Sequence, residues 1–292
     1  MKPGRPGKAD PVSTEIEDAP IKALTMATNS IHKVMAGHYW SDGGAFMGVL
    51  PYALWKEKAT VDERRRQKLN LNLLLIYSDG RWILVDTGLG NRLSDKQREI
   101  YQPSEFLLPA ALSELGLKDS DITDVIMTHL HFDHAGGVVT GFGSHEALTF
   151  PNATYWIQQS EWEMAKYPDE LNKAAYSFQH QLSLLEDTGK LCLINGEKDI
   201  APCITAVWSG GHSVGHQFVQ IDFGDRFYIY AGDIIPTWFH TSLAITSAYD
   251  VSRKESFEAK KLIYSRLKER HGSLLLDHDL TSWEIPVSSL KV

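Results

Sequence analysis

Two apolar stretches joined by a short turn form the clearest pattern in the first third of the chain. Residues 72–77 are almost continuously apolar, and residues 81–86 repeat that pattern before ending at Asp86. The segment between them contains Asp79-Gly80, a dipeptide that is typical of tight turns between antiparallel strands. The pattern therefore predicts a β-hairpin whose strands are buried or half-buried.

Helical and extended patterns alternate along the rest of the chain. Residues 109–115 have helical spacing and stop at Gly116, whereas residues 124–128 form a short extended run. Residues 255–270 alternate apolar and charged positions as an amphipathic surface helix does. Further strands are expected at residues 153–157, 204–208, 217–223, 226–231 and 273–277, and a further helix with Ser160 as its N-cap. Short connections between these elements favour one compact α/β domain whose core holds two layers of sheet.

Length and composition indicate a globular domain preceded by an extension. The chain has 292 residues, of which 43% are hydrophobic and 23% charged, and this composition excludes a disordered or fibrous protein. Residues 1–20 combine basic residues, prolines and glycines with an acidic patch but contain no apolar core. We therefore expect a flexible N-terminal extension without a targeting role, followed by a single domain at residues 21–292.

Net charge and hydropathy limit the kinds of partner that we expect the protein to bind and its expected location in the cell. With 29 Lys and Arg against 37 Asp and Glu, the net charge is −8, which argues against nucleic acid as a main ligand because such binding depends on neutralising phosphates. No apolar run approaches the roughly 20 residues that span a bilayer, so we expect no membrane association and a cytoplasmic location. Two cysteines are too few for a disulfide scaffold or a cysteine-based zinc site, whereas the twelve histidines are unevenly distributed.

The densest group of metal-binding side chains follows the extended run at residues 124–128. It reads Thr128-His129-Leu130-His131-Phe132-Asp133-His134-Ala135-Gly136-Gly137. His129 and His131 are two residues apart, so in an extended segment they project to the same side. Asp133 and His134 then turn toward a second position, and the two glycines that follow let the backbone turn sharply. Imidazole and carboxylate groups in this arrangement suit zinc and related first-row metals.

Three further candidate ligands follow predicted strands elsewhere in the chain. His212 comes after the strand at residues 204–208, Asp233 after the strand at residues 226–231, and His278 directly after the strand at residues 273–277. Loops at strand ends are held by a rigid sheet, which suits a site that must bring distant residues together.

The remaining histidines have simpler interpretations. We expect His216 to pack against its own loop or to hydrogen-bond a ligand. His240 follows Asp233 closely enough to reach the mouth of a pocket. The histidines expected at the surface or in loops are His32, His38, His145, His180 and His271.

Taken in order, these motifs resemble those of the metallo-β-lactamase superfamily. The resemblance covers about residues 71–278 and begins with Val85-Asp86-Thr87-Gly88. It implies an α/β fold, namely a four-layer αβ/βα sandwich with two central mixed β-sheets, as a hydrolase domain with metals at one edge. It also implies two divalent metal ions per chain, with zinc expected first and manganese, iron or cobalt as alternatives. Asp86 matches an aspartate that orients a ligating imidazole and does not itself bind metal.

The same resemblance assigns a role to each of the seven candidate ligands. The ligands of the first metal match His129, His131 and His212. The ligands of the second metal match Asp133, His134 and His278, and the carboxylate that bridges both metals matches Asp233. Asp133 and Asp233 are thereby implied as catalytic residues, with Asp133 carrying a proton to the leaving group.

Within this superfamily the chain is most similar to the N-acyl-homoserine lactone lactonases, and among them to the YtnP type. Residues 128–137 carry the likeness together with residues 42–49, 150–153, 211–217 and 231–237. The resemblance implies a dinuclear hydrolase that opens the lactone ring of N-acyl-homoserine lactones, and so quenches quorum signals, by attack of a metal-bridging hydroxide. The expected partner is a small-molecule ester, and the sequence leaves a homodimer open.

One position departs from the pattern of some lactonases, which carry a tyrosine three residues after the bridging aspartate. This chain has Pro236 there, followed by Trp238 and Phe239. Together with Phe46 and Met47, these two aromatic residues are expected to line an apolar substrate pocket. Such a pocket also suits an organophosphate triester or an aryl ester, so a methyl parathion hydrolase-like activity at the same dinuclear site is the main alternative. A true β-lactamase, a nuclease and a non-catalytic metal-binding module fit the residues less well.

Overall fold

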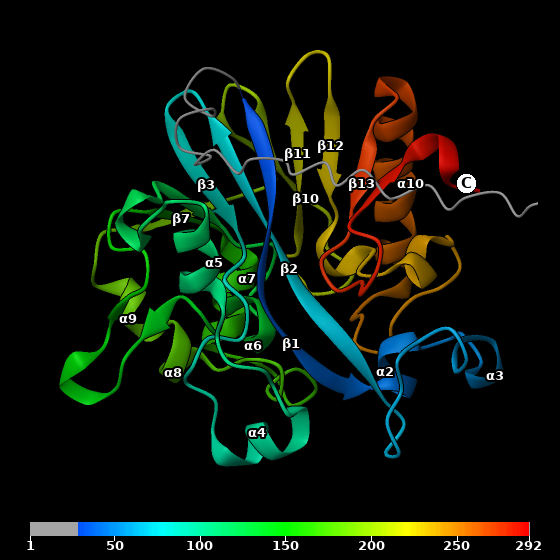
Figure 1. Cartoon of the computed structure of the whole chain (residues 1–292), viewed down its shortest axis with the longest axis horizontal. Coiled ribbons are helices and arrows are strands. Elements are labelled where there is room, and N and C mark those ends of the chain that lie inside the picture. The colour runs from blue at the N-terminus through cyan, green and yellow to red at the C-terminus, as the bar shows by residue number, and fades with distance from the viewer. Residues whose placement is uncertain (1–28, 292) are drawn as a thin grey trace, which may run out of the picture.

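Two mixed β-sheets lie face to face at the centre of the computed structural model, which describes residues 29–291 (Figure 1). The first sheet contains, in spatial order, β1 (Ser30–Asp42), β2 (Arg66–Ser78), β3 (Arg81–Val85), β4 (Asp124–Ile126), β7 (Thr154–Gln158) and β8 (Leu191–Ile194). The second contains β14 (Glu284–Pro286), β13 (Ser273–Leu275), β12 (Phe227–Tyr230), β11 (Gln217–Asp222), β10 (Ile204–Trp208) and β9 (Glu197–Ala201). Strands β3, β4, β7 and β8 pair in parallel, as do β12 and β13, so each sheet is mixed.

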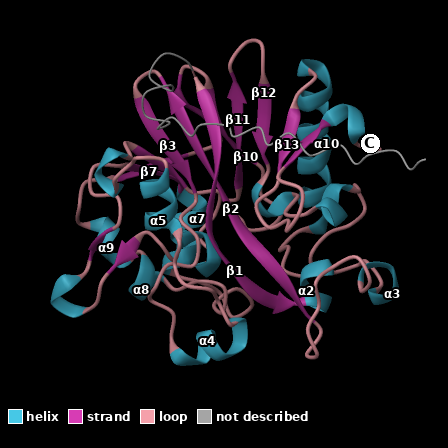
Figure 2. Cartoon of the chain, in the orientation of Figure 1, coloured by secondary structure: helices cyan, strands magenta, loops and turns pink. Residues whose placement is uncertain are grey.

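Helices lie on the outside of this pair of sheets, and strands occupy the centre (Figure 2). On the first sheet α5 (Leu108–Glu114) packs against β1 and α7 (Gln159–Lys166) against β7, whereas α10 (Arg253–Arg270) packs against β12 of the second sheet. The smaller elements are α2 (Gly43–Met47), α3 (Tyr52–Trp55), α4 (Asp95–Tyr101), α6 (Phe132–Ala135), α8 (Phe178–Gln181), α9 (Ser183–Glu186), β5 (Val139–Thr140) and β6 (Ala147–Leu148). Short 3-10 turns are η2 (Asp119–Asp121), η3 (Gly143–His145), η4 (Gly232–Ile234), η5 (Trp238–Thr241) and η6 (Val287–Ser289). The predicted four-layer α/β fold is confirmed.

Three hydrophobic clusters fill the spaces between the four layers. Leu75 of β2 packs into the cluster beneath α5 and α7, while its neighbour Leu74 packs between the two sheets. In β11, Val219 joins the cluster between the sheets and Phe218 joins the cluster under α10. Because both faces of these strands are buried, residues 73–76 are apolar throughout and do not alternate with polar positions.

Most of the predicted elements are present, with small shifts at their ends. Strands β2 and β3 form the predicted hairpin around Asp79 and Gly80, both of which have positive φ. Helix α10 begins earlier than predicted, after Ser252, whose side chain accepts a hydrogen bond from the backbone of Glu255. The predicted capping role of Ser160 is wrong, because α7 already begins at Gln159 and no side chain caps it.

Strand β1 is the longest element that the sequence did not predict, and it corrects the placement of two histidines. His32 and His38 are half-buried on this strand and do not lie in loops. A bulge between Met35 and Gly37 shifts the pairing with β2, which obscures the alternation that would have marked the strand. Strands β8, β9 and β14 were not predicted either.

Further expectations concern exposed histidines, the N-terminal extension and membrane-spanning helices. His145 and His271 are exposed, as predicted. The prediction of a flexible extension at residues 1–20 and the prediction for the side chain of His180 lie outside the described residues. Within the described part of the chain, no helix combines the length and apolar character needed to cross a bilayer.

Candidate metal centre

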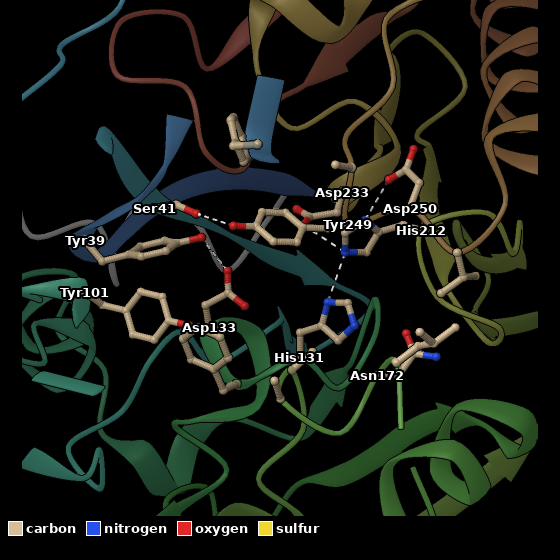
Figure 3. Close-up of a pocket in the computed structure, with 17 residues that line it drawn as sticks. Tyr39, Ser41, Tyr101, His131, Asp133, Asn172, His212, Asp233, Tyr249 and Asp250 are labelled. Carbon is tan, nitrogen blue, oxygen red and sulfur yellow. Dashed lines mark hydrogen bonds and ion pairs between the residues drawn. The ribbon is translucent and has the colours of Figure 1, made fainter. Parts of the chain in front are cut away.

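The seven candidate ligands come from four loops that follow β4, β10, β12 and β13, at one edge of the two sheets. His131 immediately precedes α6, which carries Asp133 and His134 in its single turn. Asp233 lies in η4 directly after β12. Figure 3 shows His131, Asp133, His212 and Asp233 around one cavity. The fold therefore brings together residues separated by as many as 149 positions.

The first cluster contains three buried imidazoles from His129, His131 and His212. One nitrogen of each lies within 4.8 Å of the others, and Nδ1 of His131 is 3.0 Å from Nε2 of His212. Nε2 of His129 is buried and has no hydrogen-bond partner among the described residues. Three inward-facing imidazole nitrogens are the donor set that zinc and related metals bind, and a cation satisfies all three lone pairs at once.

The second cluster contains His134, Asp233, Asp277 and His278, with one ligand atom of each within 4.8 Å of the others. Nε2 of His134 lies 3.3 Å from Nε2 of His278. Asp133, which the sequence assigned to this group, lies at its edge, with Oδ2 3.7 Å from Nε2 of His134 and 3.6 Å from Nε2 of His278. Asp277 was not among the predicted ligands.

Asp233 faces both clusters with different oxygens. Its Oδ2 lies 3.1 Å from Nε2 of His212, whereas its Oδ1 lies 3.1 Å from Nε2 of His278 and 3.5 Å from Nε2 of His134. Gly232 before it has φ +53°, and a Cβ there would lie 2.7 Å from Nε2 of His216. A carboxylate with one oxygen toward each group has the geometry that the predicted bridging role requires.

The outward nitrogens of three candidate ligands, His134, His212 and His278, are held by oxygen atoms. Nδ1 of His278 donates to the carbonyl of Asn70 at 2.7 Å, which leaves Nε2 free to bind metal. Nδ1 of His134 lies 2.9 Å from Oδ2 of Asp86, and Nδ1 of His212 lies 3.0 Å from Oδ1 of Asp250. Such partners orient an imidazole and raise its basicity toward a metal. The contact of Asp86 agrees with its predicted role, whereas Asp250 carries no motif that would have identified it.

Asp86 and Glu161 position the loops that carry these ligands. Asp86 adopts an unusual left-handed backbone with φ 62°, and its Oδ1 accepts the backbone N–H of Thr128 at 2.7 Å. The buried carboxylate of Glu161 accepts N–H of Leu130 at 3.0 Å and the hydroxyl of Ser213 at 2.6 Å. It thereby ties the loop between His129 and His131 to the loop after His212. Sequence reasoning missed Glu161, because a glutamate early in a helix gives no local signal of such a role.

His216 and the paired glycines have roles set by close packing. His216 is buried, with Nδ1 2.7 Å from Oγ of Ser209 in its own loop, as predicted. Gly136 and Gly137 lie at the centre of the expected turn, which N–H of Val138 closes on the carbonyl of Ala135 at 3.1 Å, although φ of Gly136 is −60°, a value open to any residue. A Cβ at Gly136 would lie 2.0 Å from the carbonyl of Leu89, and one at Gly137 would lie 2.2 Å from the carbonyl of Thr87. These glycines let two backbone segments approach closely behind the ligands.

A cavity of about 510 Å³ opens onto the two clusters. Its ligand-bearing wall includes the carboxylates of Asp133 and Asp233. Hydroxyl and aromatic groups form much of the remainder, with Oγ of Ser41 3.3 Å from the hydroxyl of Tyr249 (Figure 3). The apolar lining residues are Phe46, Phe132, Leu171, Ala174, Ala175, Ala248 and Val251. A volume in this range suits a small ester with an apolar substituent.

The predicted substrate pocket is corrected at three of its four residues. Phe46 lines the cavity, but Met47 is fully buried in the core, because adjacent residues of the one-turn helix α2 point in different directions. Trp238 is 54% exposed and Phe239 packs against the core cluster under the first sheet, and neither lines the cavity. His240 is also buried and does not line the cavity, and its Nε2 donates to the carbonyl of Phe46.

Electrostatics at the two clusters suits divalent cations. Burial and then the neighbouring histidines lower the pKa of His129 and of His131 well below the usual value, so both rings are neutral and can bind metal. Burial raises the pKa of Asp233, but His212, His278 and His134 outweigh it and hold that pKa well below the usual range. Asp233 and other carboxylates in turn outweigh burial and raise the pKa of His134, His212 and His278, so this place favours positive charge, as a pair of divalent first-row metal ions would supply.

Comparison with known proteins places this architecture in a family. The family model of the metallo-beta-lactamase superfamily matches residues 68–269. An N-acyl homoserine lactonase of Bacillus cereus is 32% identical over 151 residues, or 48% of this chain and 53% of that enzyme. The chain thus matches about half the length of this curated relative.

Solved structures show the same fold over most of the chain. A probable metal-dependent hydrolase from Staphylococcus aureus is 31% identical and has a TM-score of 0.83, with 89% of this chain and 93% of that chain covered. AidC, a dizinc quorum-quenching lactonase in complex with a homoserine product, is 19% identical and has a TM-score of 0.69. That comparison covers 88% of this chain and 89% of AidC, and at this identity it bears on the fold alone.

Proposed function

The chain belongs to the metallo-beta-lactamase superfamily, and from this membership we propose that it is a dinuclear metal-dependent hydrolase that opens the lactone ring of N-acyl-homoserine lactones. The observation that carries the proposal is the arrangement of two ligand clusters that share Asp233 and open onto one cavity. The N-acyl homoserine lactonase of Bacillus cereus, similar over half its length, supports a lactone as the substrate.

The residues of the two clusters would hold two divalent ions. His129, His131 and His212 would hold the first ion, His134 and His278 with Asp133 the second, and Asp233 would contact both. When bound, such ions polarise an ester carbonyl and lower the pKa of water so that a nucleophile is available at neutral pH. Zinc is the expected metal, and manganese, iron and cobalt accept the same ligands.

Asp133 is the group best placed to move a proton. It lines the cavity, and its Oδ2 accepts a hydrogen bond of 2.6 Å from the hydroxyl of Tyr39. Oδ1 remains available on the same carboxylate to carry a proton to the ring oxygen that leaves when the lactone opens. Tyr39 also supplies a phenol at the cavity wall, whereas the position three residues after Asp233 is Pro236.

The aromatic lining of the cavity supports a second candidate substrate class. Tyr39, Phe46, Tyr101 and Tyr249 lie on its walls, and flat aromatic walls also suit an aryl ester or an aryl phosphotriester. The two substrate classes would use different parts of the cavity. The acyl tail of a lactone would contact apolar lining residues such as Leu171 and Val251, whereas a compact aryl substrate would contact only the walls beside the metals.

A hydrolysis screen tests the proposal. Purified protein loaded with zinc or manganese would be assayed against homoserine lactones of graded acyl length, paraoxon and an aryl acetate. We expect the highest kcat/KM for a lactone, and we expect Asp233→Ala to lose turnover together with bound metal. A higher kcat/KM for paraoxon or the aryl acetate would replace the lactone by the second class. Full metal content without hydrolysis of any of these substrates would contradict both.

A further inference from the structure

Asp277 is a buried carboxylate next to the second cluster. It lies between β13 and His278 and is 2% exposed. Neither of its oxygens has a hydrogen-bond partner among the described residues. An isolated carboxylate in such a place is strongly unfavourable unless a cation or a proton compensates its charge.

The backbone around Asp277 aims this carboxylate at the second cluster. The carbonyl of Asp277 accepts N–H of Asn72 at 2.8 Å, and N–H of His278 donates to the carbonyl of Pro236 at 3.0 Å. The chain bends at Asp277 and His278, so the two adjacent side chains do not point to opposite sides as they would in a strand. As a result, Oδ2 of Asp277 lies 3.9 Å from Nε2 of His278.

The surroundings of Asp277 are metal-ligand atoms and few hydrogen-bond donors. One of its oxygens lies within 4.8 Å of a ring nitrogen of His134 and of an oxygen of Asp233. Oδ1 of Asp233 is likewise buried without a hydrogen-bond partner among the described residues. The nearby hydroxyl of Tyr230 donates instead to the carbonyl of Asn72 at 3.1 Å. Two buried carboxylates this close repel one another unless a positive charge lies between them.

We propose that Asp277 is an additional ligand of the second metal ion, on the side of that ion away from the cavity. The inference rests on the dinuclear site proposed above and adds a residue that the family pattern in the sequence did not assign. Asp277 does not line the cavity, whereas Asp133 lines it and is held by Tyr39. The two carboxylates would thus have different roles. Asp277 would serve only as a ligand of the ion, whereas Asp133 could also carry a proton.

Metal titration of Asp277→Asn is the first test, with metal affinity and not activity as its readout. Protein stripped with a chelator would be titrated with zinc and with manganese in competition with a chromophoric chelator. We expect the variant to bind one of its two ions at least tenfold more weakly than the unaltered protein and to bind the other equally well. The matched control is Asp279→Asn, because Asp279 lies on the other side of His278 and accepts N–H of Trp238, Thr281 and Ser282. This control should keep both affinities.

The asparagine variant also distinguishes a metal-binding Asp277 from the main alternative, a protonated Asp277. Asparagine has the shape of a protonated aspartate, so it would preserve the site if Asp277 were a neutral acid that shares a proton with Asp233. Two metals bound with unaltered affinities in Asp277→Asn would therefore overturn the inference. The proposed lactone hydrolysis would be unaffected by that outcome, because it needs only the seven ligands already named.

A cysteine at the same position gives a positive signal that does not depend on the asparagine variant. In Asp277→Cys loaded with cobalt, a thiolate ligand produces a sulfur-to-cobalt charge-transfer band in the near ultraviolet. The unaltered protein, whose Cys192 and Cys203 are outside the cluster, is the control without that band. We expect the band to appear at one thiolate per chain. Its absence from a variant that holds two cobalt ions would also overturn the inference.

Discussion

The hydroxyl of Tyr39 on β1 donates a hydrogen bond of 2.6 Å to Oδ2 of Asp133 in α6. Burial, and then the charges of Asp133 and Asp233, raise the pKa of Tyr39 well above its usual value, so the phenol remains a donor throughout the neutral range. The contact joins β1 to the segment that carries the candidate ligands of α6, and it leaves Oδ1 of Asp133 without this partner.

Replacing Tyr39 by Phe should lower kcat without releasing metal. A hydrogen bond to a charged group is worth about 1.5–3 kcal/mol, so we expect kcat to fall by roughly one to two orders of magnitude. The metal ligands themselves are unchanged, and we expect two ions per chain in the variant. Steady-state kinetics and metal analysis on the same preparation would measure both quantities.

Tyr101→Phe is the matched control for this variant. Tyr101 lines the same cavity and packs its ring edge-on against Tyr39, but no hydrogen bond joins its hydroxyl to Asp133. We expect less than a threefold change in kcat. An equal loss in both variants would show that the cavity wall as a whole matters and that the bond to Asp133 does not.

Removing the carboxylate of Asp250 should weaken metal binding at the first cluster. Asp250 lies 3.0 Å from Nδ1 of His212 and orients that ring, and loss of such a partner typically costs 10- to 100-fold in metal affinity. We expect a loss of this size for Asp250→Ala and a smaller loss for Asp250→Asn, whose amide oxygen still accepts from the ring. Asp225→Ala, at an exposed aspartate, provides the baseline. Identical metal affinities in Asp250→Ala and Asp225→Ala would contradict the orienting role.

The sequence allowed seven candidate ligands to be proposed because their chemistry and their position coincide. His129, His212, Asp233 and His278 each follow an apolar strand, and strands of a sheet that run in the same direction end at the same edge. Residue type and strand position were both visible in the sequence, so the clusters could be expected before their geometry was known.

The residues that support those ligands could not be predicted in the same way. Glu161, Asp250 and Tyr39 act on loops that are distant in the sequence, so their roles depend on which elements pack together. Asp277 adjoins a predicted ligand but carries no spacing signal of its own. The pocket prediction was wrong at Met47 and Trp238 because an apolar residue in a short turn can face the core, the cavity or solvent, and no periodicity distinguishes these outcomes over one turn.

His240 should make the folded protein less stable in mild acid. Burial, and then the nearby Lys260 ammonium, lower the pKa of His240 to about 4, against 6.5 in an unfolded chain. As the pH falls from 6.5 toward 4, the unfolded chain binds a proton that the folded protein excludes, so the free energy of unfolding decreases through this window. Above pH 6.5 the imidazole is neutral in both states and contributes no slope.

The variant His240→Gln isolates this effect. Its amide can still donate to the carbonyl of Phe46 and accept from Thr237, the two partners of the imidazole, but it does not titrate. Between pH 7 and pH 5 we expect the unaltered protein to lose about 2 kcal/mol more unfolding free energy than the variant. Denaturant unfolding at several pH values measures this difference, and acid release of metal affects both proteins alike. Parallel pH profiles would show that His240 does not bind the proton at issue.

Acyl-chain length should affect kcat/KM through contacts with Leu171 at the cavity and not through contacts with Trp238. Each methylene that becomes buried contributes at most about 0.8 kcal/mol, or roughly a fourfold gain in kcat/KM, so activity should rise with chain length to a plateau. Leu171 lies on the cavity wall yet is 92% exposed, which leaves its side chain available to cover a bound acyl chain. Leu171→Ser should therefore flatten the rise while it leaves the shortest lactone almost unaffected. Trp238→Ser, at an exposed apolar residue outside the cavity, should keep the full rise. If Trp238→Ser flattens the rise and Leu171→Ser does not, the acyl chain follows the η5 side of the molecule and the cavity described above binds only the ring.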